Sequence, residues 1–107
     1  MSDVVIVLST VPDDDSGEQL ARALVEERLA ACVNVHGPML SVYWWRGTVE
    51  RSAERQIVIK TSRARLPALE ARLKALHSYE LPEFVVVPVE GGSTDYLDWV
   101  HEVLQVR

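Results

Sequence analysis

Cysteine is almost absent from this sequence, since Cys32 is the only one among 107 residues. No disulfide can therefore form within the chain, which favours a reducing compartment. Long apolar runs are absent too, because no segment approaches the roughly 20 apolar residues that a membrane-spanning helix needs. The chain opens Met1-Ser2-Asp3 without the basic region of a signal peptide. These absences predict a cytoplasmic protein without a membrane partner.

Positive charge is scarce as well. The chain has 11 Lys and Arg residues against 16 Asp and Glu residues, and its formal net charge is -5. A nucleic-acid-binding protein needs a basic face that displaces counterions from the phosphates, and an anionic membrane attracts basic clusters in the same way. The charge balance therefore argues against nucleic acid as a partner and against docking on a membrane.

Apolar and charged residues are present in ordinary globular amounts, at 48% and 25% of the chain. A chain of 107 residues is long enough for one hydrophobic core. We therefore predict a single domain, residues 1–107, whose folding requires no cofactor and no metal.

The N-terminal residues predict a strand followed by a helix. Val4 to Leu8 is a continuous apolar run, typical of a central strand that is covered on both faces. Ser16 and Gln19 have the spacing of a capping box, which predicts that Ser16 caps a helix. Apolar residues at helical spacing then continue from Leu20 to Leu29.

The middle of the chain predicts a long, bent hairpin. Residues 31–45 and 48–61 are rich in β-branched and aromatic side chains, and Arg46-Gly47 between them favours a tight turn. Gly37-Pro38 interrupts the first run and predicts a bulge or kink.

The last part of the chain predicts helix, strand and helix. Leucines recur at helical spacing from Leu66 to Leu76, with Pro67 in the first turn. Phe84 to Val87 predicts a buried strand, and Ser93 or Thr94 caps a last helix. The element order predicts an α+β fold, namely a ferredoxin-like βαββαβ sandwich with a long bent hairpin and an additional C-terminal helix.

A ferredoxin-like fold hosts many functions, so the candidate residues decide between them. Aliphatic central strands and negative charge exclude an RNA-recognition module. The segment after the first strand, Ser9 to Asp13, lacks the basic residues of an anion-binding loop, which excludes an acylphosphatase-like enzyme. A metal-binding or small-molecule-sensing domain stays open.

Few residues have the pattern of an active site. Cys32 lies at the start of a strand without a nearby histidine, which favours an inert core residue over a nucleophile or metal ligand. His77 favours a satisfied surface role, although one histidine from each of three subunits can build a site on a symmetry axis. Glu80 and Glu83 form a carboxylate pair without a positioned partner. The sequence therefore predicts no catalytic residue and no enzymatic activity.

Tyr43-Trp44-Trp45 is the most unusual local feature. Adjacent strand residues face opposite sides, so the two indoles cannot share a face. One indole is expected to cover the core, and the other is expected to contact another subunit. All three residues are therefore interface candidates, with packing inside one chain as the alternative.

Several segments, taken in order, resemble the CutA divalent-cation tolerance proteins. They cover nearly the whole chain and are specific as a combination: Thr10 to Asp13, Leu29 to Asn34, Ser41 to Gly47, Lys60-Thr61, His77 to Glu83 and Tyr96 to Trp99. The resemblance implies a ferredoxin-like homotrimer similar to the P-II signalling proteins. It also implies a role in tolerance of divalent metals, especially copper, by binding or sensing and not by a defined reaction.

The resemblance also implies a ligand cleft between subunits. Its candidate lining is taken from the matching motifs: Cys32, Asn34, Trp45, Lys60, His77, Tyr79 and Glu80. Lys60 is the residue expected to hold an anion or to pair with Glu80, and Tyr79 is expected to supply a hydroxyl donor.

The metal ligands of some relatives are only partly kept. Ser9 stands where they carry Cys, Leu76 replaces the first residue of a His pair, and Ser78 replaces a Pro. His77 is the one retained ligand, so a Cu²⁺ site is expected to be weaker than in those relatives. The alternative function is a structural or adaptor trimer that presents a surface or an inter-subunit cleft to a protein or small molecule.

Overall fold

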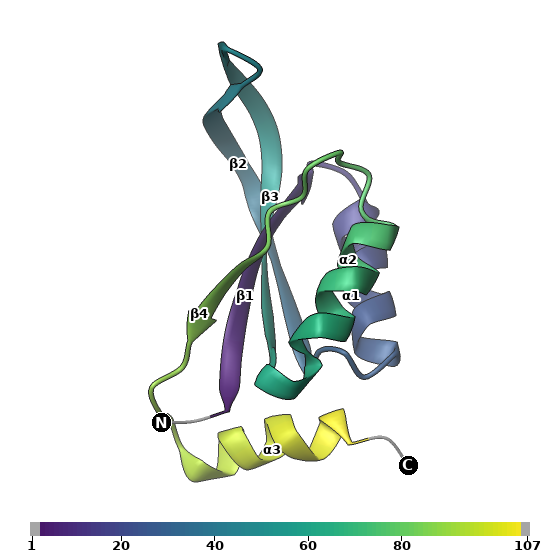
Figure 1. The fold of residues 1–107 in the computed structure, drawn as a ribbon, viewed down its shortest axis with the longest axis vertical. Coiled ribbons are helices and arrows are strands. Elements are labelled where there is room, and N and C mark those ends of the chain that lie inside the picture. Colours follow the sequence, from purple (N-terminus) through teal and green to yellow (C-terminus); the bar gives the residue numbers. More distant parts are fainter. Residues whose placement is uncertain (1–2, 106–107) are drawn as a thin grey trace.

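The computed structural model describes residues 3–105. Figure 1 shows a twisted antiparallel sheet with helices on one face and at one end. The elements are β1 Val4–Pro12, α1 Ser16–Glu26, β2 Cys32–Trp45, β3 Thr48–Ser62, a 3₁₀ turn Arg63–Arg65, α2 Leu66–Leu76, β4 Val85–Pro88 and α3 Thr94–Leu104.

The sheet has the order β2-β3-β1-β4, and all neighbouring strands run antiparallel. The two βαβ connections each leave room for one strand between the strands that they join, which is the ferredoxin-like arrangement. The predicted α+β fold, with its long hairpin and additional C-terminal helix, is confirmed. β1 lies inside the sheet, as its apolar run predicts.

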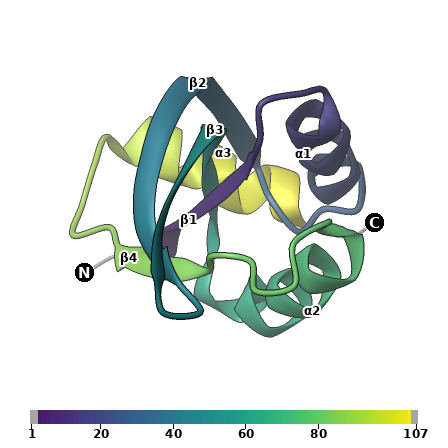
Figure 2. The ribbon, with the colours of Figure 1, turned by 90° about the horizontal axis from the view of Figure 1, so that it is seen from above.

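Alternation along β1 divides the sheet into two faces. Val7 and Val11 point toward α1 and α2 and pack in the main buried cluster with Leu24, Ile59 and Leu73. Figures 1 and 2 show both helices on this side of the sheet. A second, smaller cluster joins Val4 and Ala31 to Val100 and Leu104 of α3, which crosses the end of the sheet.

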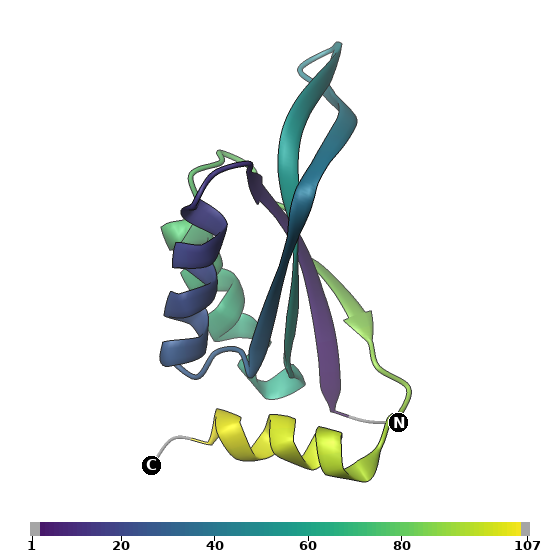
Figure 3. The same cartoon turned by 180° about the vertical axis from the view of Figure 1, so that it is seen from behind.

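The opposite face of the sheet is not covered by a helix within residues 3–105, as Figure 3 shows from behind. Ile6 and Leu8 of β1 are half-buried there, next to Val87 and Val85 of β4. Those two valines are 38% and 48% exposed. The prediction that Val4 to Leu8 is covered on both faces is therefore wrong for one chain. The prediction of a buried strand at Phe84 to Val87 is wrong for the same reason, because β4 lies at the edge of the sheet and is mostly exposed. We call this surface the open sheet face.

β2 and β3 extend well beyond the helices and give the molecule its length of 44 Å (Figure 1). Arg46 and Gly47 connect them with φ values of 50° and 82°. Positive φ at both central residues is typical of a type I′ turn, whose twist matches that of paired strands. The predicted tight turn is confirmed, and so is the predicted irregularity at Gly37-Pro38, where the β2–β3 register shifts between His36 and Met39.

Helix capping follows the sequence at one helix and departs from it at another. Ser93 caps α3 and accepts a hydrogen bond from the backbone N–H of Tyr96. The predicted capping box at Ser16 is wrong, because Asp15 occupies the cap position and Ser16 is the first helical residue. Asp14 accepts hydrogen bonds from both the backbone and the hydroxyl of Ser16. These bonds hold the pKa of the Asp14 carboxyl below its usual value.

Two buried hydroxyls in the sheet differ in their hydrogen bonding, so their removal is expected to change stability in opposite directions. Ser9 and Thr61 are both fully buried, but only Thr61 donates a hydrogen bond, to the Leu29 carbonyl at 2.8 Å. Ser9 Oγ has no hydrogen-bond partner among residues 3–105. We expect Ser9→Ala to raise the free energy of unfolding by about 1 kcal/mol and Thr61→Val to lower it by about 1 kcal/mol. Urea denaturation measures both, and a loss of stability in Ser9→Ala would contradict the expectation.

Candidate functional site

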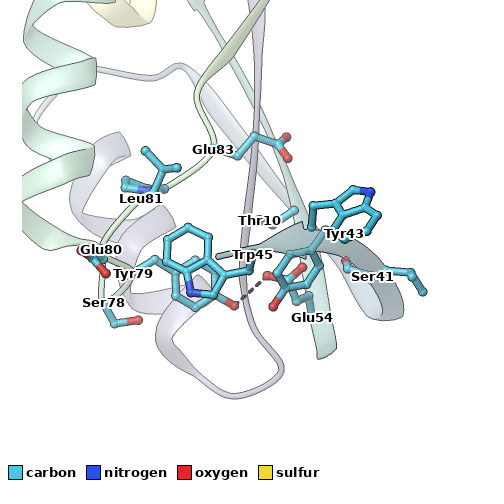
Figure 4. A pocket seen from close by; sticks show the side chains of 13 residues that line it. Thr10, Ser41, Tyr43, Trp45, Glu54, Ser78, Tyr79, Glu80, Leu81 and Glu83 are labelled. Atoms are coloured by element: carbon cyan, nitrogen blue, oxygen red, sulfur yellow. Dashed lines mark hydrogen bonds between the residues drawn. The ribbon is translucent and has the colours of Figure 1, made fainter. Parts of the chain in front are cut away.

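A cavity of about 800 Å³ lies between the projecting hairpin and the segment that connects α2 to β4 (Figure 4). We call it the hairpin cavity. It is lined mainly by aromatic, acidic and small polar side chains: Thr10, Ser41, Val42, Tyr43, Trp44, Trp45, Glu54, Ser78, Tyr79, Glu80, Leu81, Pro82 and Glu83.

Strand alternation places one tryptophan in the wall of this cavity. Ser41, Tyr43 and Trp45 share one face of β2, and their partners on β3 include Ser52, whose hydroxyl lies 2.7 Å from that of Tyr43. Trp45 is half-buried, whereas Trp44 points to the other face and is 74% exposed. The expectation that the indoles take opposite sides is therefore met, but the expectation that one of them covers the core is wrong, because neither packs on a core cluster of residues 3–105.

Tyr79 connects the loop to the hairpin. Its hydroxyl donates a 2.7 Å hydrogen bond to Glu54, a carboxylate that is only 6% exposed (Figure 4). Burial, followed by the bond and charge of Glu54, raises the pKa of Tyr79 well above its usual value. Tyr79 therefore stays neutral and serves as a donor, as expected, but its acceptor is the chain's own Glu54.

His77 has both ring nitrogens in hydrogen bonds. Nδ1 accepts from the backbone N–H of Tyr79 at 3.0 Å, so Nε2 carries the proton and donates to the Thr10 carbonyl at 2.7 Å. The imidazole also packs on the Tyr79 ring, with centroids 4.7 Å apart. In one chain His77 therefore orients the loop and has no free lone pair for a metal.

Glu80 of the cavity lining is held by Arg46 from the hairpin turn. Arg46 Nη2 donates to Glu80 Oε2 at 2.6 Å, and the same guanidinium lies 5.2 Å from the centroid of the Trp45 ring. Both partners of the ion pair are mostly exposed, so the bond contributes about 0–1 kcal/mol to stability. Within the chain Glu80 thus pairs with Arg46, and not with Lys60.

The other expected cleft residues lie on the open sheet face. Cys32 is paired directly opposite Lys60 on β3, and Asn34 lies opposite Val58. Cys32 Sγ lies 4.0 Å from Asn34 Oδ1, and the ammonium of Lys60 lies 5.8 Å from the Tyr96 ring centroid. In a single chain the expected cleft residues therefore lie in two separate groups. The first group is on the open sheet face, and the second consists of Trp45, His77, Tyr79 and Glu80.

Residues 3–105 contain no group of three or more His, Cys, Asp or Glu side chains arranged to hold a metal ion. The side chains of a single chain therefore do not supply enough convergent donor atoms for a divalent cation. Donors from a neighbouring subunit and a rearranged His77 would both be required.

Sequence reasoning missed Thr10, Arg46 and Glu54. Their roles depend on partners 25 to 67 positions away, such as His77 for Thr10 and Glu80 for Arg46. Glu54 also lies just after the register irregularity opposite Met39, which no spacing rule specifies. Glu83 was recognised with Glu80 only as a carboxylate pair, and it too lines the cavity.

Comparison with known proteins gives one family throughout. The family model described as "CutA1 divalent ion tolerance protein" matches residues 5–103. The divalent-cation tolerance protein CutA of Thermus thermophilus is 45% identical over 97 residues, which cover 91% of this chain and 94% of that protein. The chloroplastic protein CutA 1 of Oryza sativa is 43% identical over 90% of this chain, which spans only 54% of that longer relative.

Solved structures show the same similarity. The crystal structure of CutA from Xylella fastidiosa superposes with a TM-score of 0.94 at 43% identity, covering 97% of this chain and 100% of the other. Another relative, from Archaeoglobus fulgidus, is described as periplasmic. Among the described residues of this chain, the helices are all too short or too polar to cross a membrane.

Proposed function

Because the chain belongs to the CutA1 divalent ion tolerance protein family, we propose that it acts in copper tolerance as a cytoplasmic homotrimer that binds Cu²⁺ without catalytic turnover. A role in metal tolerance follows the names of its relatives, which are called tolerance proteins and not enzymes. The assembly, the metal and the compartment are the parts that we add.

The main support for the proposed trimer is an apolar stripe on the projecting hairpin. Leu40, Val42, Trp44 and Val49 share one face of the hairpin and are 54–74% exposed. No core lies behind this part of the hairpin, so folding of one chain does not require apolar residues there. Contiguous exposed apolar side chains with a central Trp are typical of a protein interface. We call these four residues the hairpin stripe.

The open sheet face supports the same proposal. Ile6, Leu8, Val85 and Val87 are apolar, yet they remain half-buried or exposed in one chain. An inner strand that is apolar on both faces requires a cover on both faces. A neighbouring copy supplies that cover, and closed symmetry allows all copies to use the same surfaces. Three copies are expected from the resemblance to P-II-like trimers.

A Cu²⁺ site in this trimer would lie between subunits, with His77 as the retained ligand. Its Nδ1 would first have to release the backbone N–H of Tyr79. Loss of that bond opposes binding, and Ser9 offers no thiolate at the position where some relatives carry Cys. We therefore propose a weak site whose affinity depends on His77.

Isothermal titration of the assembled protein with Cu²⁺, with chelator controls, tests the metal. We expect His77→Ala to weaken binding at least about tenfold, because it removes the only retained imidazole. His101→Ala is the matched control, since His101 is exposed on α3, far along the chain from the cavity. Binding of the unaltered protein no tighter than about 1 mM, or an equal loss in both variants, would contradict the metal proposal.

An adaptor trimer is the second candidate function. It is favoured by the two occupied nitrogens of His77 and by the lack of a metal-binding cluster among residues 3–105. An assembled protein that does not bind Cu²⁺ would support this candidate over the first.

A further inference from the structure

We propose that the hairpin cavity binds a small organic cation of the alkylammonium class. This inference goes beyond copper tolerance and does not depend on a Cu²⁺ site. It follows from the shape of the cavity, its aromatic walls, its negative charge and the position of one of the chain's own cations.

Aromatic rings line the cavity from two sides. Tyr43 and Trp45 come from the hairpin, and Tyr79 comes from the loop (Figure 4). The faces of such rings attract cations, most strongly those whose charge is spread over apolar substituents and is weakly hydrated. A volume of about 800 Å³ is within the range of small-molecule sites.

The lining is acidic and contains no Lys or Arg. Glu54, Glu80 and Glu83 are its charged members. Glu54 accepts from Tyr79, and Glu80 is bound by Arg46. Glu83 is half-buried but makes no hydrogen bond or ion pair to any residue between 3 and 105. A partly buried carboxylate without a partner is costly, and a cation in the cavity would lower that cost.

Arg46 shows how an organic cation is bound by an aromatic ring and a carboxylate of this chain. Its guanidinium, an organic cation, lies 5.2 Å from the centroid of the Trp45 ring while it binds Glu80 at 2.6 Å. Another carboxylate of the same lining has no such cation, because Glu83 makes no ion pair with any residue between 3 and 105. A ligand cation at that position would complete the pattern.

The dispersed carboxylates favour an organic cation over a bare metal ion. A divalent ion needs several donor atoms that converge within about 2.0–2.6 Å. Within the described part of the chain no such group exists. Of the cavity's glutamates, Glu54 is bound by Tyr79 and Glu80 by Arg46, whereas Glu83 is bound by neither. A large cation with spread charge interacts with separate carboxylates and rings without convergent ligation.

Tetramethylammonium is the probe, and the assembled full-length protein is titrated with it. The indole N–H signal of Trp45 in a ¹H–¹⁵N spectrum, assigned with Trp45→Phe, reports binding. We expect a saturable shift with a millimolar Kd. tert-Butanol, a neutral molecule of similar size, and sodium chloride at equal ionic strength are expected to give no saturable shift.

Two variants test the residues. Glu83→Gln is expected to weaken binding about fivefold, because it removes the unpaired charge and keeps the shape. Trp45→Leu removes the indole reporter, so its binding is followed through the backbone amide signal of Leu81 in the cavity lining. It is expected to weaken binding about threefold or more through loss of the ring face. Glu90→Gln and Trp99→Leu make the same changes outside the cavity lining and are expected to leave the Kd unchanged. Sedimentation of each variant shows whether assembly has changed. A variant that assembles like the unaltered protein reports an effect on binding alone.

Equal binding of tert-butanol would overturn the proposal by showing a merely apolar pocket. Equal weakening in Glu90→Gln and Glu83→Gln would overturn it by showing a diffuse charge effect, and no saturable shift would mean that no such site exists. A quaternary ammonium cannot replace a metal at an imidazole. Failure of this test therefore leaves the His77-dependent Cu²⁺ result unchanged, and the reverse also holds.

Discussion

Trp44→Glu is expected to convert the assembled protein into folded monomers. Trp44 is 74% exposed in one chain and lies in the hairpin stripe, so its side chain adds little to the fold of that chain. At the centre of an apolar interface a buried carboxylate without a partner would be strongly unfavourable. Exposed Trp residues that become buried are also typical interface hot spots, whose loss costs at least about 2 kcal/mol. Each trimer would carry this cost at three equivalent contacts.

Sedimentation equilibrium measures the result directly. The unaltered protein is expected to have three times the mass of its 12.0 kDa chain, and the variant the mass of one chain. Ala71→Glu is the control, because it places the same charge on an exposed position of α2 outside the hairpin. Circular dichroism should be the same for all three proteins. A monomeric unaltered protein, or a variant that stays trimeric, would contradict the proposed assembly.

The hairpin and the sheet were predictable from the sequence because their signals are local. Arg46-Gly47 between two β-rich runs specifies the turn, and the positive φ of both residues satisfies its geometry. Gly37-Pro38 marks the register shift for an equally local reason. The apolar run Val4 to Leu8 correctly placed β1 inside the sheet. The cover that the run predicts for its second face is missing, because no helix among residues 3–105 lies over that face.

The site was less predictable because its contacts join distant parts of the chain. Motif matching found Trp45, His77, Tyr79 and Glu80, which lie around the hairpin cavity. It did not reveal that Thr10 and the Tyr79 backbone occupy both nitrogens of His77. Spacing describes which residues share a strand or helix face, whereas these bonds depend on how a loop crosses the end of β1. The physical role of His77 therefore required the structure.

Leu73→Ala is expected to have the largest effect on the stability of the individual chain. Leu73 is fully buried between α2 and the sheet, in the cluster that includes Leu24 and Ile59. Removing its side chain leaves a cavity and costs about 2–5 kcal/mol. Domains of this size have a free energy of unfolding of about 5–15 kcal/mol, so one substitution would remove a large part of it.

Urea denaturation of Leu73→Ala should be measured in the Trp44→Glu background, because the proposed subunit association would add to apparent stability by mass action. Leu81→Ala is the matched control, since Leu81 is 72% exposed and its truncation is expected to change stability by less than about 0.5 kcal/mol. A cost below about 1 kcal/mol for Leu73→Ala would mean that the cluster under α1 and α2 does not stabilise the chain by itself.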